Sequence, residues 1–134
     1  MDFILSTGGR EKYFKALNVS DCVTRAIAIA TETDYKKIYD LIYQYAGESP
    51  RNGVYPLVVD NVLLDLGWKY HKPRKEIYLA DYKPKFNVVI CRTDKHHITT
   101  IKHGDLYDMW DCRRKNPRVV GYWTKPNLNH GINI

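Results

Sequence analysis

The chain has 134 residues, the size of one domain, and 44% of them are hydrophobic, which is enough for a core. Charged residues make up 27% and mix both signs, which argues against global disorder. The net charge is +6, but the 21 Lys and Arg are spread along the sequence. Three cysteines at wide spacing predict neither a disulfide framework nor a CxxC redox pair. We therefore expect one domain over residues 1–134, with its core at about 18–124 and irregular termini.

Targeting and membrane signals are missing from the sequence. No stretch approaches the roughly 18 apolar residues that suggest a membrane span. The amino terminus lacks a basic region followed by a long apolar run, so we expect no signal peptide. A cytoplasmic protein with reduced thiols and no membrane partner is the expectation.

Three helices are predicted in the first half, because apolar residues recur there with helical spacing. Residues 1–19 show no periodicity, and Gly8-Gly9 indicates a turn. The residues that should begin and end the helices are Ser20 or Asp21 before the first, Thr33 and Gly47 around the second, and Pro56 and Gly67 around the third.

Strands are predicted in the second half. The segments with strand character are 68–70, 86–92, 97–101, 106–110 and 118–124. Residues 102–105 are typical of a hairpin turn between the third and fourth of these segments. Helices followed by strands predict an α+β fold, with N-terminal helices packed on a C-terminal antiparallel sheet.

Cys22 falls in the first turn of the first predicted helix. A helix amino terminus favours the thiolate, which is the nucleophilic form of cysteine. A histidine packed against that helix end could form an ion pair with the thiolate, and a carboxylate or amide could then orient the ring. His96 and His97 both begin a predicted strand, and strand alternation turns one of them inward without deciding which.

The hairpin limits which carboxylate can orient the histidine. With a two-residue turn at His103-Gly104, Leu106 faces Ile101, and Asp108 lies diagonal to His97 on the same face. A three-residue turn would shift the register by one residue and bring Asp111 opposite His97 instead. The two-residue turn is commoner, so Asp108 is preferred and Asp111 is the alternative acid.

Three segments of the chain carry a family resemblance. They are Asn18-Val-Ser-Asp21-Cys22-Val-Thr-Arg25-Ala26, His97-Ile-Thr-Thr-Ile101 and Leu106-Tyr107-Asp108-Met-Trp110-Asp111. Together they resemble small papain-like cysteine peptidases. The likeness is greatest to phage and bacterial proteins with an N-D-C-x-x-R-A helix start and a later G-H-x-x-x-V…Y-D-x-W-D hairpin, which are related to the peptidase domains that trim bacteriocin leader peptides. The resemblance covers about residues 18–124.

The resemblance implies a role for each matching residue. Cys22 would be the nucleophile, His97 the general base and Asp108 the orienting acid. The oxyanion-hole side chain, usually Gln in this family, would be Asn18. The sequence departs from the family pattern in two places, since His96 replaces the Gly before the histidine and no Gln precedes Cys22.

A zinc site would be a different use of the same residue types. It would be built from Cys91, His96 or His97, and Cys112. These residues lack the close ligand pairs of common structural zinc sites. We therefore expect no metal and no organic cofactor.

Two binding functions compete with hydrolysis. Eleven Tyr, three Trp and the positive net charge could form a nucleic-acid surface, but three of the tyrosines fall on a helical core stripe and no known nucleic-acid motif is present. A papain-like scaffold could also bind or inhibit another protein without hydrolysis. The sequence favours a cysteine peptidase or isopeptidase with a peptide or protein substrate, acting in a bacterial cell or a phage-infected one.

Overall fold

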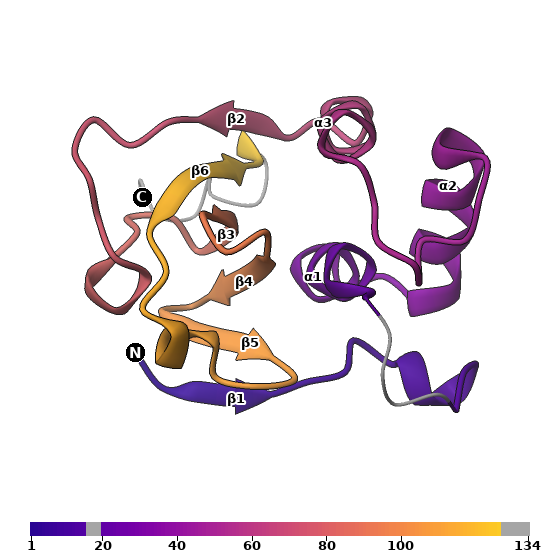
Figure 1. Ribbon diagram of the computed structural model, residues 1–134, viewed down its shortest axis with the longest axis horizontal. Helices are drawn as coiled ribbons and strands as arrows, with labels where there is room; N and C mark the ends of the chain where they lie inside the picture. The colour runs from indigo at the N-terminus through magenta and orange to yellow at the C-terminus, as the bar shows by residue number, and fades with distance from the viewer. Residues whose placement is uncertain (16–19, 127–134) are drawn as a thin grey trace.

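The computed structural model describes residues 1–15 and 20–126. Within these ranges the chain forms an α+β fold with three helices and a six-stranded sheet (Figure 1). The helices are α1 (Cys22–Thr31), α2 (Tyr35–Ala46) and α3 (Pro56–Asp65). Helices α1 and α3 contact the sheet, and α2 packs on those two helices. The strands are β1 (Phe3–Leu5), β2 (Lys69–His71), β3 (Val88–Thr93), β4 (Ile98–Lys102), β5 (Asp105–Asp108) and β6 (Val119–Thr124). Short 3₁₀ helices form at Arg10–Lys12, Leu79–Asp81 and Cys112–Lys115.

The three predicted helices are confirmed, and their ends follow the expected signals. Asp21 precedes the first residue of α1, and Pro56 occupies the first position of α3. Gly47 follows α2 with φ of 74°, a left-handed conformation that glycine adopts without steric cost.

The sheet has the order β1-β5-β4-β3-β6-β2 and is mixed. Neighbouring strands run antiparallel except β1 and β5, which are parallel and place Leu5 beside Asp108. The C-terminal strands β2 to β6 thus pair antiparallel, as predicted, but the sheet is mixed because the N-terminal β1, where an irregular terminus was expected, joins it in parallel. The three residues of β1 show no clear alternation, and the pairing of this strand with β5 depends on the tertiary fold.

The core lies on both faces of the sheet. In β3 the side chains alternate, so that Val88 and Ile90 join the cluster under the helices, whereas Val89 and Cys91 join a second cluster on the opposite face. Helix α1 contacts β3, β4 and β5, and in Figure 1 it lies between the sheet and α2. This position brings the amino terminus of α1 to the connections that precede β4 and follow β5.

The β4–β5 hairpin has the predicted two-residue turn. Ile101 pairs with Leu106, and Lys102 pairs with Asp105. His103 and Gly104 have φ of 51° and 83°, as a type I′ turn requires. This register fixes which face of β5 Asp108 occupies.

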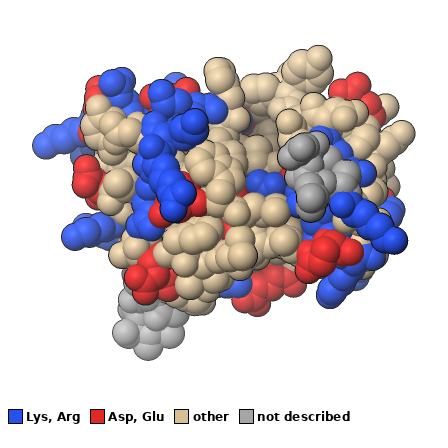
Figure 2. Space-filling view, turned by 60° about the horizontal axis from the view of Figure 1, so that its bottom comes forward, with Lys and Arg blue, Asp and Glu red and all other residues tan. Residues whose placement is uncertain are grey.

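The surface shows no continuous basic stripe on the face seen in Figure 2. Lys and Arg gather toward both sides of this face, with Asp and Glu among them and uncharged residues between. Within the described residues, no helix is both long and apolar enough to cross a membrane.

Candidate active site

Cys22 is the first residue of α1 and is partly exposed. Burial raises the pKa of the thiol, but hydrogen bonding and charge from His97, a hydrogen bond from the Ile98 backbone and the charge of Arg25 together lower it below the usual value. The thiolate is therefore favoured at a helix end whose dipole also favours an anion.

His97 lies immediately before β4 and connects the thiol to a carboxylate. Its Nε2 is 2.7 Å from Oδ2 of Asp108, and the Cys22 and Cys112 thiols lie close enough to the ring to act on its pKa. Burial lowers the pKa of His97, but the bond to Asp108 and the two thiols raise it well above its ordinary value. The Trp110 ring lies against the imidazole, with the two centroids 5.5 Å apart. An imidazolium is therefore held beside the Cys22 sulfur.

Asp108 ends β5 and is 3% exposed. Its Oδ2 accepts from His97 and from the Thr99 hydroxyl at 2.8 Å, and its Oδ1 accepts from the Met109 N–H at 2.7 Å. Burial raises the pKa of Asp108, but these bonds and the charge of Arg25 lower it below its usual value. The carboxylate is ionised and fixed in orientation.

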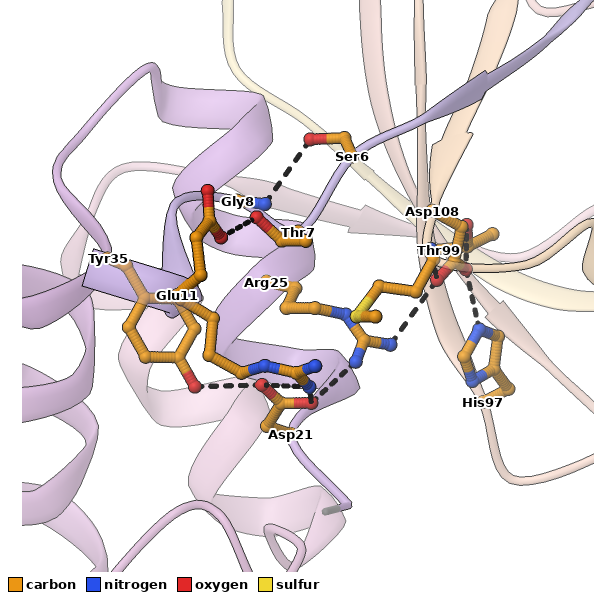
Figure 3. A network of polar contacts seen from close by, with 12 residues as sticks. Ser6, Thr7, Gly8, Glu11, Asp21, Arg25, Tyr35, His97, Thr99 and Asp108 are labelled. Atoms are coloured by element: carbon orange, nitrogen blue, oxygen red, sulfur yellow. Dashed lines mark hydrogen bonds and ion pairs between the residues drawn. The ribbon is translucent and has the colours of Figure 1, made fainter. Parts of the chain in front are cut away.

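A chain of buried ion pairs continues from Asp108 toward the N-terminus (Figure 3). Arg25 Nη2 is 3.3 Å from Asp108 Oδ1, and Arg25 Nη1 is 2.5 Å from Asp21 Oδ1. Asp21 also accepts from Arg10 at 3.2 Å and from the Tyr35 hydroxyl at 2.8 Å. Asp21 therefore makes no side-chain cap on α1, although it was one of the two residues, with Ser20, that the sequence offered for that role.

The structure brings together three of the five predicted site residues: Cys22, His97 and Asp108. Asp111 is directed elsewhere, because its carboxylate accepts from the backbone and guanidinium of Arg113. Of the two candidate acids, Asp108 is thus the one that contacts His97. Asn18 lies outside the described residues.

Two cavities share Cys22, His97, Ser20 and His96 in their walls. The first, of about 250 Å³, is otherwise lined mainly by apolar side chains, which include Val23, Val54, Pro56, Val59 and Ile98. The second, of about 410 Å³, is lined by polar and large side chains, which include Arg10, Asp21, Arg25, Met109 and Trp110. A reactant at the Cys22 sulfur would therefore have room for an apolar group and for a polar one.

His96 occupies the position at which the papain-like pattern, to which the sequence was likened, has glycine. Its φ is 56°, so the backbone keeps the left-handed conformation that glycine favours. Histidine is among the residues that tolerate this conformation better than most. Histidine in place of glycine at this position therefore keeps the backbone conformation of the loop between β3 and β4, which leads into His97.

One group of side chains has the spacing of metal ligands. Among the described residues, ligand atoms of His97, Asp108 and Cys112 lie within 4.8 Å of one another, whereas Cys91 and His96 of the predicted zinc site are not in this group. A metal here would have to replace the hydrogen bond between His97 and Asp108. The nearby Arg25 guanidinium would also repel a cation.

The sequence patterns gave no role to three residues that bond Asp21 or Asp108. Arg25 entered only as part of a family pattern, and Arg10 and Thr99 were not singled out. One signal was available, since Asp21 and Arg25 stand four residues apart, the spacing of an ion pair on a helix, and Arg25 interrupts an apolar run. Arg10 carried no such signal, because it meets Asp21 only through the tertiary fold.

Comparisons with known proteins find no match: no family model, no curated protein and no solved structure is significantly similar to the chain. The chemistry of the site is therefore argued from its geometry.

Proposed function

We propose that this protein is a cysteine hydrolase, a peptidase or isopeptidase of papain-like type, with Cys22, His97 and Asp108 as its triad. The observation that carries the proposal is the position of His97, which bonds Asp108 through Nε2 and lines the same two cavities as the Cys22 thiol at a helix amino terminus. A buried structural cysteine needs neither a charged imidazole nor a fixed carboxylate behind it.

The mechanism follows from these contacts. The Cys22 thiolate attacks the carbonyl carbon of an amide, and the electron pair of the C=O bond moves onto oxygen. The backbone N–H at the start of α1 would stabilise that oxyanion, and we propose Asn18 as the second donor. His97 gives its proton to the leaving amine, so that the C–N bond breaks and a thioester remains on Cys22. Neutral His97 then takes a proton from water, whose oxygen attacks the thioester and releases the acid and the Cys22 thiolate.

The two cavities support a peptide or protein substrate. An apolar side chain next to the scissile bond would fit the 250 Å³ cavity, while the polar cavity of about 410 Å³ would accept the continuing chain. We propose a preference for an aliphatic residue beside the cleaved bond.

The proposal is tested by the pH dependence of Cys22 alkylation with iodoacetamide, followed by mass spectrometry of the Cys22 peptide. Because Cys91 and Cys112 are buried, the informative comparison is between variants rather than between thiols. In the wild type, Cys22 should already react at pH 6, since its pKa is depressed. His97→Gln should slow the reaction at pH 6 by at least ~10-fold, because the thiolate loses its cationic partner.

An alkylation profile that is the same in wild type and His97→Gln would contradict the proposal. Hydrolysis is then tested with a library of internally quenched peptides, with Cys22→Ala as the control. An activated Cys22 with no cleavage of any peptide or isopeptide would favour the non-hydrolytic scaffold.

A further inference from the structure

Arg25 joins the helix of the nucleophile to the strand of the acid. It follows Cys22 by three residues, so both side chains project from the same side of α1. Its guanidinium contacts Asp21 at the start of α1 and Asp108 at the end of β5. The side chain is only 8% exposed, and a buried guanidinium is tolerated only where carboxylates or other acceptors surround it.

The donors to Asp108 come from different parts of the fold. Thr99, Met109 and His97 all belong to the β4–β5 hairpin or to its flanking residues. Arg25 is the donor that comes from α1. With the hairpin contacts alone, the Asp108 carboxylate could move together with β5 relative to Cys22. The contact from Arg25 instead fixes β5 to α1, the helix that carries Cys22.

The charges around Cys22 give Arg25 a second consequence. Asp21 precedes Cys22 in the chain, and an uncompensated carboxylate there would disfavour the thiolate. Arg25 and Arg10 both bond this carboxylate, and Arg25 also contacts Asp108. The D-C-x-x-R spacing therefore has a physical reason. Arg25 offsets the charge of the Asp21 carboxylate and positions the Asp108 carboxylate.

We propose that Arg25 is a positioning residue, which holds the Asp108 carboxylate against His97 and so sets the ion pair between His97 and Cys22. This inference rests on the proposed function, because it assigns Arg25 a task in the same site. It predicts that Arg25 acts on Cys22 through Asp108, and not only through its own charge.

The test compares Cys22 alkylation by iodoacetamide across pH in full-length variants. Arg25→Met should slow the reaction at pH 6 by about tenfold, which corresponds to a rise of about one unit in the thiolate pKa. Arg10→Met is the matched control, since it removes a buried guanidinium from Asp21 and from the same cavity without touching Asp108. Arg10→Met should shift the pH profile of Cys22 alkylation by less than half as much as Arg25→Met does. An equal shift in the two variants would overturn the inference.

The coupling to Asp108 is measured with a double-mutant cycle. In an Asp108→Asn background, Arg25→Met should change the alkylation profile little, because the carboxylate that it positions is already gone. Full additivity of the two substitutions would show that Arg25 acts by its charge alone and would overturn the positioning role. If Arg25→Met does not fold, Arg25→Lys replaces it in the test. Lysine keeps the positive charge but lacks the forked guanidinium that reaches both Asp21 and Asp108. An alkylation profile of Arg25→Lys identical to that of the wild type would therefore also overturn the inference.

The outcomes separate this inference from the proposed function. If wild-type Cys22 titrates as an ordinary thiol, the proposed function fails. If wild-type Cys22 is activated and Arg25→Met matches it, only the role of Arg25 fails.

Discussion

The carboxylate of Asp108 has both oxygens engaged. Oδ2 accepts from His97 and Thr99, and Oδ1 accepts from Met109 and Arg25. A buried aspartate with this many donors remains ionised and keeps one orientation, and both are needed to hold an imidazolium beside a thiolate. Asp111 lies three residues further along, yet its carboxylate begins the 3₁₀ helix Cys112–Lys115 and pairs with Arg113.

Substitution of the two aspartates should therefore have unequal effects. Asp108→Ala should lower peptide hydrolysis by about 10²-fold, the size of effect that a positioned acid–base partner contributes. Asp111→Ala should leave hydrolysis within about twofold, since the carboxylate contacts Arg113 rather than the triad. Alkylation of Cys22 at pH 6 gives the same comparison without a substrate. Equal losses in the two variants would remove Asp108 from the triad.

The N-terminal arm, Phe3 to Lys12, is the element that completes the site. Its strand β1 pairs with β5, and the Ser6 N–H donates to the Asp108 carbonyl at 2.8 Å. The arm then turns at Gly8, where an added Cβ would lie 3.3 Å from the backbone of Arg25. The arm thus contacts both β5, which carries Asp108, and α1, which carries Cys22.

Two glycine substitutions test how closely the arm must approach α1. Gly8 and Gly47 have φ of +68° and +74°, so alanine at either position should lower the free energy of unfolding by about 1 kcal/mol. A Cβ at Gly47 meets nothing within 4 Å, whereas one at Gly8 crowds Arg25. Gly8→Ala should therefore be the more destabilising in urea titrations and should also slow Cys22 alkylation. Equal stability losses with unchanged alkylation would show that the close approach is unimportant.

Local sequence patterns predicted the elements that are long enough to show a repeat of apolar residues, or that begin or end at a characteristic residue. The three helices, the β4–β5 register and the preference for Asp108 over Asp111 as the neighbour of His97 belong to this group. Strand β1 and the bond between Arg10 and Asp21 do not, because each exists only when distant segments meet. The choice of His97 over His96 came from the family resemblance, since strand alternation treats the two alike.

At the scale of the whole molecule, burial outside the triad keeps one thiol and two phenol groups protonated. Burial raises the pKa of Cys91 and of Tyr35 and Tyr82 above their ordinary values. Each of these groups keeps in the folded chain a proton that the unfolded chain loses as the pH rises through about 8.5 for cysteine and about 10 for tyrosine. Since the unfolded state then has fewer protons, the free energy of unfolding falls as the pH rises.

Cys91→Ala isolates one of these contributions. At pH 7 the variant should be less stable than the wild type, because a fully buried side chain has lost its sulfur. Above pH 9 its free energy of unfolding should fall less steeply, by about 1.4 kcal/mol per pH unit, because one buried acid has been removed. Urea denaturation from pH 7 to 10.5 measures both slopes. Parallel curves would show that Cys91 ionises equally in the two states.

The order in which the site residues occur along the chain has a consequence during protein synthesis. Cys22 leaves the ribosome long before His97 and Asp108 have been made, and Arg25 cannot meet Asp108 until β5 has paired with β4 and β1. Such distant contacts form late in folding. Until then Cys22 is an ordinary thiol, of which only a few per cent is thiolate at neutral pH. A nascent or truncated chain would therefore lack the activated Cys22 that we propose for the folded protein.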